Sequence, residues 1–213
     1  VGMAEAFEKP LDMSVALRKH VPSQAGLGGG SSDAAAVMRG LARMWQIDLD
    51  DERVVRLAQS LGADVAFFLH EVPSYLDGRG DVLRETFAPF SVPVVLVKPD
   101  QGVSTGACYR LLDEMATPAP QVEPMLEALR TRDVPGALAA VANNMEPAAL
   151  QLAPAIAEVF AFLQDSGACQ AGPLLCGSGS CVCAFVGDLA VAERLAAQAR
   201  EHGWWACAST TLA

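Results

Sequence analysis

A glycine-rich segment near the start of the chain constrains the fold more than any other feature. Residues 26–30 read Gly-Leu-Gly-Gly-Gly. Such a backbone can adopt positive φ angles and can approach a ligand closely. Residues 34–45 follow and are rich in helix formers, and Ser31, Ser32 and Asp33 before them carry side chains that can cap a helix N-terminus. The pattern therefore predicts a glycine loop that leads directly into a helix.

The residues before this loop alternate between apolar and other side chains. Met13, Val15 and Leu17 occupy alternate positions, which predicts a strand over residues 13–19. A helix that follows a glycine loop can bind phosphate, because its first N–H groups are unpaired and lie at the positive end of the helix dipole. We therefore predict a phosphate-binding loop, with the hydroxyl of Ser31 or Ser32 placed to ligate Mg²⁺ or to contact a phosphate oxygen.

The loop differs from two common nucleotide-binding motifs. A P-loop ends in Gly-Lys followed by Ser or Thr, and this loop contains no lysine. A dinucleotide fingerprint requires a ribose-binding carboxylate about 20 residues further on, and no convincing one is present. The remaining alternative is a flexible linker. Leu27 interrupts the glycines and a helix follows at once, which favours a ligand-binding loop.

The rest of the chain predicts alternating short elements. The first half contains a helix capped by Asp48 or Asp50 that ends at Gly62, strands over residues 65–69, 73–76, 82–86 and 92–97, and a turn at residues 77–80. The second half contains a helix from Ser104 or Thr105 to Leu112, a linker at 118–124, helices over 125–132, 134–142, 153–166 and 188–202, and strands over 174–175, 181–186 and 204–212. The tail therefore reads helix, strand, strand, helix, strand, which is typical of an α+β domain with an antiparallel sheet covered on one face.

Composition excludes several classes of protein. The net charge of −10 provides no basic surface for nucleic acid. No apolar run approaches the roughly 20 residues of a membrane span, and the first residues lack the pattern of a secretory signal. Six cysteines without a CxxC pair indicate free thiols in a reducing cytoplasm rather than a zinc site. We expect a cytoplasmic protein with a small-molecule substrate and no nucleic-acid or membrane partner.

Five segments resemble motifs of the GHMP kinases, in the same order. Residues 22–35 read Pro-Ser-Gln-Ala-Gly-Leu-Gly-Gly-Gly-Ser-Ser-Asp-Ala-Ala and resemble the second motif of that family. The other four are Leu-Gly-Ala-Asp-Val at 61–65, Pro-Asp-Gln-Gly-Val-Ser-Thr at 99–105 with Tyr109, Asn-Asn-Met-Glu at 143–146, and Cys-Gly-Ser-Gly-Ser-Cys at 176–181, which resembles the third motif. Together they are most similar to the 4-diphosphocytidyl-2-C-methyl-D-erythritol kinases of non-mevalonate isoprenoid biosynthesis.

The resemblance implies an α+β, two-domain GHMP kinase fold. Its N-terminal part, residues 1–98, would be ribosomal protein S5 domain 2-like and truncated at its start, and residues 99–213 would form a ferredoxin-like C-terminal domain. The implied activity is transfer of the γ-phosphoryl group of ATP, with Mg²⁺, to the 2-hydroxyl of 4-diphosphocytidyl-2-C-methyl-D-erythritol. The implied protein is a monomer or homodimer.

The resemblance also implies roles for individual residues. Asp64 would be the catalytic base, although by pattern alone it reads as a turn aspartate. Tyr109 would stack on the cytosine of the substrate, although an aromatic at this helical spacing also suits a core. Gly177, Ser178 and Gly179 would close the phosphate and substrate site, although Gly-Ser-Gly also suits a plain hairpin turn. The ATP and phosphate contacts would come from Pro22, Gly26, Leu27, Gly28, Gly29, Gly30, Ser31 and Ser32.

One family motif has no counterpart in these 213 residues. GHMP kinases of this branch begin with a segment resembling Ala-Pro-Ala-Lys-Ile-Asn-Leu, whose lysine pairs with the catalytic aspartate. Lys19 lies before the loop and does not replace it, so we expect this chain alone to be weakly active or inactive. Two alternatives stay open, namely a GHMP kinase for another alcohol and a non-catalytic nucleotide-binding or interaction module.

Overall fold

The computed structural model describes residues 1–70, 72–78, 80 and 82–211. The chain forms two compact units, each with its own hydrophobic core. The first unit contains Val1–Val21 and Gly28–Phe87, and the second contains Pro22–Leu27 and Ala88–Ala213. Within the described residues, no helix is both long and apolar enough to cross a membrane.

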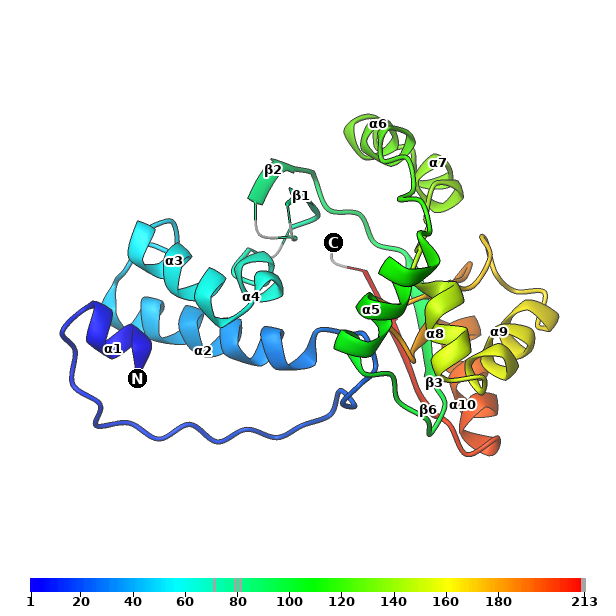
Figure 1. Ribbon diagram of the computed structural model, residues 1–213, viewed down its shortest axis with the longest axis horizontal. Helices are drawn as coiled ribbons and strands as arrows, with labels where there is room; N and C mark the ends of the chain where they lie inside the picture. The colour runs from blue at the N-terminus through cyan, green and yellow to red at the C-terminus, as the bar shows by residue number, and fades with distance from the viewer. Residues whose placement is uncertain (71, 79, 81, 212–213) are drawn as a thin grey trace. The chain divides into compact units, whose positions relative to one another are not determined.

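The first unit is a helical cluster with one hairpin (Figure 1). Its elements are α1 (Gly2–Ala6), α2 (Gly29–Trp45), α3 (Glu52–Leu61), α4 (Ala63–Phe67) and the antiparallel strands β1 (Ser74–Asp77) and β2 (Val82–Thr86). Small and flexible apolar side chains from the four helices fill the core, namely Met3, Ala35, Met38, Ala42, Val54, Ala58 and Val65, with Leu69 just beyond α4. The two strands confirm the predicted pair; parts of the turn between them lie outside the described residues.

The helix after the glycine loop begins five residues earlier than predicted. Gly28 is the residue at the N-terminal cap of α2, with a left-handed φ of 62°, and no side chain caps the helix. Ser31, Ser32 and Asp33 therefore lie inside the first turns, and the prediction that they cap the helix was wrong. Glycine can adopt the left-handed conformation of this cap without steric cost, which is why the helix extends back to Gly29.

Asp51 caps α3, one residue beyond Asp50, the nearer of the two predicted candidates Asp48 and Asp50. Its carboxylate accepts hydrogen bonds from the backbone N–H of Arg53 at 2.9 Å and from the Arg53 guanidinium at 2.7 and 3.0 Å. The side-chain hydrogen bond from Arg53 is the main reason that the pKa of Asp51 falls from 3.8 to about 2. Gly62 ends the helix, as predicted.

This lowered pKa predicts a pH-dependent contribution to stability. Because the folded protein holds Asp51 ionised more strongly than the unfolded chain, the stabilisation is present above about pH 4 and is lost as the pH falls through about 2. Asp51→Asn keeps a capping oxygen but removes the charge. We expect the difference in melting temperature between the wild type and Asp51→Asn to be largest near pH 6 and to shrink toward about pH 2 in scanning calorimetry. A difference that stays constant over this range would contradict the assignment.

Two predicted strands are absent. Residues 65–69 lie in α4 and the turn after it; Val65 and Leu69, four residues apart, are buried while the residues between them are partly exposed, which is helical spacing. Residues 13–19 are extended without strand pairing in the described structure, and Val15 and Leu17 are 61% and 60% exposed. A strand is stable only when its backbone groups pair with a neighbour, and this segment pairs with none of the described strands.

The second unit contains one antiparallel sheet of four strands. β3 (Pro93–Lys98), β4 (Leu174–Leu175), β5 (Val182–Phe185) and β6 (Trp205–Thr210) lie in the order β4-β5-β3-β6. Helices α5 (Thr105–Met115) to α9 (Ile156–Asp165) separate β3 from β4, and α10 (Leu189–Glu201) separates β5 from β6. This strand-helix-strand-strand-helix-strand order is the ferredoxin-like topology, which confirms the expectation for the C-terminal part.

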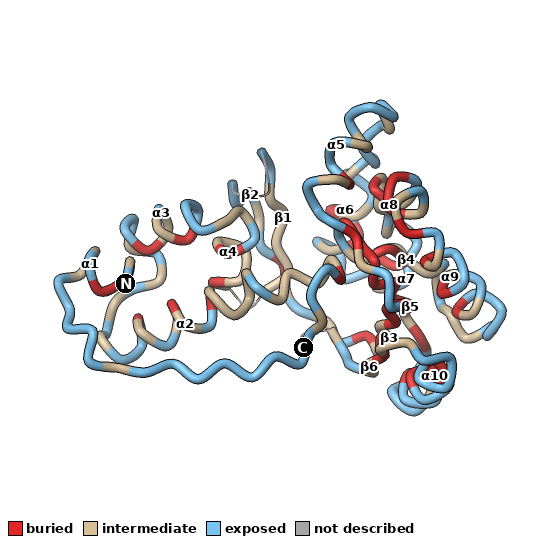
Figure 2. Tube along the Cα trace, turned by 60° about the horizontal axis from the view of Figure 1, so that its bottom comes forward, coloured by how far each residue is buried: buried red, intermediate tan, exposed pale blue. Residues whose placement is uncertain are grey.

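One face of this sheet forms the centre of the second core. Val95 and Val97 of β3 pair with small or branched residues on both neighbouring strands and are fully buried. α9 and α10 pack on this face, and Figure 2 shows buried positions along β3 and β5. In Figure 1, the green β3 and red β6 run side by side beside α10. The Asp188 side chain caps α10 through the Val191 N–H at 2.8 Å, as predicted.

The compact units divide the chain differently from the predicted boundary at residues 98 and 99. β3 precedes that boundary, yet both of its neighbours belong to the C-terminal sheet, so the second unit starts at Ala88 and also takes Pro22–Leu27. The predicted linker at 118–124 joins α5 to α6 (Glu123–Thr131) inside that unit. The predicted helices correspond to α6, α7 (Val134–Ala139) and α9, whereas α8 (Glu146–Leu152) was not predicted.

Candidate phosphate-binding site

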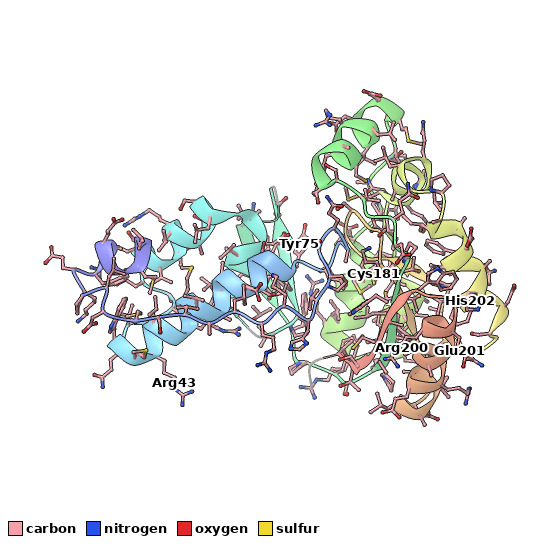
Figure 3. All side chains as sticks on the ribbon, turned by 90° about the horizontal axis from the view of Figure 1, so that it is seen from below. Arg43, Tyr75, Cys181, Arg200, Glu201 and His202 are labelled. Atoms are coloured by element: carbon pink, nitrogen blue, oxygen red, sulfur yellow. The ribbon has the colours of Figure 1, made fainter. Side chains whose placement is uncertain are left out.

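Three segments that are distant in sequence meet in the second unit. They are Pro22–Leu27, residues 99–104 after β3, and the 176–180 turn between β4 and β5. The backbone carbonyl of Gln24 accepts hydrogen bonds from the N–H of Ser180 at 3.1 Å and of Val103 at 3.4 Å. The carbonyl of Ala25 accepts from the N–H of Cys181 at 3.1 Å, and Figure 3 shows Cys181 beside this blue loop. The segment of the third motif therefore contacts the glycine loop, as the resemblance implied.

Two glycines make this contact possible. Gly26 has a φ of +71°, and a Cβ built on it would overlap the carbonyl oxygen of Cys176 and lie 2.7 Å from the nitrogen of Gly179. Gly177 has a φ of +49°, and a Cβ built there would lie 2.7 Å from the carbonyl oxygen of Gly26. The two backbones thus touch with no room for a side chain at either position. Glycine is required at both for steric reasons as well as for its φ angle.

Ser180 links the three segments and was not among the predicted site residues. It is fully buried; its N–H donates to Gln24, and its Oγ donates to the carbonyl of Gln101 at 2.5 Å. Ser178 is 5% exposed, and its hydroxyl lies 3.0 Å from that of Thr105 at the start of α5. Lys98 is buried, and its Nζ donates to the carbonyls of Pro99 and Asp100. A glycine-serine turn in the sequence identifies this region, but the serine that joins the loops becomes evident only from the contacts.

We expect Ser180→Ala to destabilise the protein by about 0.5–1.5 kcal/mol, because it removes the hydrogen bond from the buried Ser180 hydroxyl to the Gln101 carbonyl. Urea unfolding followed by circular dichroism measures this loss. Ser209→Ala in β6 is the matched control, since Ser209 is exposed and its hydroxyl donates only to the adjacent Thr210 carbonyl at 3.4 Å. The control is expected to change the free energy of unfolding by no more than about 0.5 kcal/mol. Equal losses in both variants would contradict the linking role of Ser180.

In the first unit, the N-terminus of α2 offers free backbone donors. No side chain caps it, and the first N–H groups of an α-helix have no partner within the helix. A Cβ built on Gly30 would meet nothing within 4 Å, so space is open at this end of the helix. A Cβ on Gly28 would lie 2.7 Å from the Phe68 ring, which packs against the cap. The geometry fits a phosphate group that accepts hydrogen bonds from the helix N-terminus.

The candidate magnesium ligands lie in the first turn of α2. The Ser32 hydroxyl donates to the carbonyl of Gly29 at 3.0 Å, which leaves its lone pairs available. Ser31 is partly exposed in the same turn. Asp33 forms an ion pair with Lys19 from the extended segment before the loop. A serine hydroxyl that supplies one oxygen beside phosphate oxygens and water suits Mg²⁺, which seldom relies on protein ligands alone.

Asp64 lies in the first turn of α4, also in the first unit, and is exposed. It precedes Phe68 by one helical turn, and Phe68 contacts Gly28 at the cap of α2. The Phe68 carbonyl also accepts a hydrogen bond from Arg39 of α2 at 3.0 Å. α4 therefore packs against the helix that begins in the glycine loop. This packing fixes the position of the Asp64 carboxylate relative to α2 within the first unit.

Tyr109 lies in α5 of the second unit, one turn after Thr105, and is 55% exposed. An exposed ring on a helix does not contribute to the core, so the core interpretation of Tyr109 was wrong. A planar base can stack on an exposed aromatic face.

Leu27 and Pro22 belong to the segment that docks on the 176–180 turn.

The surroundings of Cys176 favour the neutral form of its thiol. Hydrogen bonding with Cys181, and after it burial, raises the pKa of Cys176, so the group remains a neutral thiol near neutral pH. All six cysteines are free. Across the described part of the chain, no group of three or more His, Cys, Asp or Glu side chains is arranged to hold a metal ion. Cys176 therefore serves the site through its backbone carbonyl.

The fold and the two glycine segments correspond to a known family. The model of the GHMP kinases N terminal domain matches residues 1–71, and that of the GHMP kinases C terminal matches residues 125–203. Together with the relatives below, these matches show that the chain belongs to the GHMP kinase family.

Several relatives share the name of one branch of that family. A protein named 4-diphosphocytidyl-2-C-methyl-D-erythritol kinase from Exiguobacterium sibiricum is 34% identical over 193 residues, covering 91% of this chain and 67% of the relative. A protein of the same name from Pelotomaculum thermopropionicum is 36% identical over 187 residues, which cover 87% of this chain and 64% of the relative. A crystal structure of 4-(cytidine 5'-diphospho)-2C-methyl-D-erythritol kinase superposes with a TM-score of 0.81 at 34% identity, covering 98% of this chain and 74% of that one. The chain thus spans about two thirds of the length of the two curated relatives.

Proposed function

We propose that this chain binds Mg²⁺-ATP and transfers its γ-phosphoryl group to the 2-hydroxyl of 4-diphosphocytidyl-2-C-methyl-D-erythritol. The observation that carries the proposal is the close contact of two glycine segments, Gly26 against Gly177, followed in the chain by a helix N-terminus without a side-chain cap. Such a helix end supports phosphate binding through N–H donors and the helix dipole. The names of the relatives support the choice of substrate. Cytoplasmic isoprenoid precursor synthesis would be its setting.

Each predicted residue has a role in this proposal. Gly28, Gly29 and Gly30 provide backbone donors to the phosphates, and Ser31 or Ser32 provides a hydroxyl for Mg²⁺, which supplies positive charge to the phosphate oxygens. Pro22, Gly26 and Leu27 hold the loop on the 176–180 turn. Ser178, with Gly177 and Gly179, shapes the substrate side, and Tyr109 stacks on cytosine.

The reaction itself requires little covalent chemistry from the protein. The 2-hydroxyl oxygen forms a bond to the γ-phosphorus, the bond between that phosphorus and the bridging oxygen of ADP breaks, and the hydroxyl proton passes to the Asp64 carboxylate. Positioning and charge stabilisation account for most of the catalysis in phosphoryl transfer. General-base catalysis by a positioned carboxylate adds typically about 10²–10⁴-fold.

The test is ADP release from Mg²⁺-ATP with and without 4-diphosphocytidyl-2-C-methyl-D-erythritol, with homoserine and mevalonate as alternative alcohols. Calorimetric titration with Mg²⁺-ADP is run in parallel. Release that depends on the cytidyl substrate supports the proposal, and release with another alcohol supports a sibling kinase. Nucleotide binding without turnover supports a non-catalytic nucleotide-binding module. The absence of both nucleotide binding and turnover would contradict the proposed nucleotide site.

A further inference from the structure

Asn143 uses its entire side-chain amide to hold the 176–180 turn. Its Nδ2 donates to the carbonyl of Leu175 and to the carbonyl of Gly177, each at 2.8 Å. Its Oδ1 accepts a hydrogen bond from the backbone N–H of Met145 at 2.9 Å. Two carbonyls on one side and an N–H on the other determine the orientation of the amide. No other residue type combines these donors and this acceptor in a side chain of the same size.

The two carbonyls that Asn143 holds flank the contact with the glycine loop. Leu175 is the last residue of β4, and Gly177 is the glycine whose backbone touches Gly26. Between them lies Cys176, whose carbonyl oxygen also faces Gly26. β4 pairs with β5 through only two residues. Backbone hydrogen bonds from Cys176 N–H to the Cys181 carbonyl at 2.9 Å and from Gly179 N–H to the Cys176 carbonyl at 2.8 Å continue into the turn. The Asn143 amide adds a constraint on the Leu175 and Gly177 carbonyls themselves.

We propose that Asn143 is a positioning residue for the phosphate loop, acting through the 176–180 turn. It holds the carbonyls of Leu175 and Gly177 so that Gly26 can dock and so that the N–H groups of Ser180 and Cys181 reach the carbonyls of Gln24 and Ala25. The structural part of this inference stands on the contacts within the second unit. Only its effect on nucleotide affinity rests on the proposed function.

Asn143→Asp isolates the donor role. The aspartate keeps the shape of the side chain and an oxygen for the Met145 N–H, but it places a carboxylate oxygen against two carbonyl oxygens. Asn144→Asp is the matched control, because Asn144 is the next residue and donates to neither Leu175 nor Gly177. Asn143→Ala removes the same donors without adding a charge, and it serves if the aspartate variant folds poorly.

Amide hydrogen exchange measured by NMR reports on the docking directly. In Asn143→Asp we expect the Ser180 and Cys181 amides to exchange at least about tenfold faster than in the wild type, because their bonds to Gln24 and Ala25 open more often. Buried amides of α10, such as those of Ala196 and Ala199, are expected to keep their rates. Asn144→Asp is expected to match the wild type at both places.

Titration with Mg²⁺-ADP supplies the second readout. We expect Asn143→Asp to raise the dissociation constant by about fivefold or more, and to raise the KM for ATP more than it lowers kcat. Unchanged exchange at Ser180 and Cys181 would overturn the proposal, as would faster exchange throughout α10, which marks a general loss of stability. Faster exchange confined to the docking amides, in a protein whose wild type binds no nucleotide, supports the positioning role and counts against the proposed function alone.

Discussion

Gly26→Ala is expected to lower the free energy of unfolding by about 2–3 kcal/mol and to weaken Mg²⁺-ADP binding by at least about tenfold. Alanine is strained at the φ of +71°, and its Cβ would overlap the Cys176 carbonyl oxygen. The overlapping atom is backbone, so a side-chain rotation cannot relieve it. The 22–27 segment therefore has to leave the 176–180 turn, and the hydrogen bonds to Gln24 and Ala25 are lost with it.

Urea unfolding and calorimetric titration measure these two effects. Gly172→Ala is the control in the same unit, because a Cβ at Gly172 meets nothing within 4 Å. The control is expected to alter stability by no more than about 0.5 kcal/mol and to leave nucleotide affinity unchanged. A Gly26→Ala protein with wild-type stability and wild-type affinity would show that the glycine contact has no part in either property.

Asp64→Asn is expected to lower the rate of phosphoryl transfer by about 10²–10⁴-fold while leaving the dissociation constant for Mg²⁺-ADP within about twofold of the wild type. The amide cannot accept the proton of the attacking hydroxyl, but it retains the size of the carboxylate. Asp64 is exposed in the first turn of a five-residue helix, so the substitution removes only a modest favourable interaction with the helix dipole. The loss should therefore lie in catalysis rather than in folding.

Single-turnover measurement with enzyme in excess is the suitable assay, because it detects slow chemistry. Asp165→Asn, at the exposed end of α9, controls for the loss of one negative charge and is expected to retain the wild-type rate. An Asp64→Asn rate within about threefold of the wild type would exclude Asp64 as the base. A parallel loss of melting temperature and rate would instead assign it a structural role.

The amino-acid sequence was most informative where structure depends on neighbouring residues. The sequence predicted a helix after the glycine loop, within the segment from Gly28 to Trp45, and it predicted that Asp188 caps α10. The alternating helices and strands after residue 153 predicted an α+β domain with an antiparallel sheet, because hydrophobic periodicity and capping residues are local signals. The ferredoxin-like topology was implied by the family resemblance. Five motifs in order indicated the family. These features required no knowledge of which segments meet.

Tertiary contacts decided the rest. Residues 65–69 form a helical turn because Val65 and Leu69 reach one core from the same side, and residues 13–19 are not a strand because no described strand pairs with them. The hydrogen bonds of Ser180 to Gln101 and of Asn143 to Leu175 and Gly177 join residues that are dozens of positions apart. A local pattern cannot specify which distant carbonyl a side chain will reach, since that depends on how the loops pack around the finished sheet.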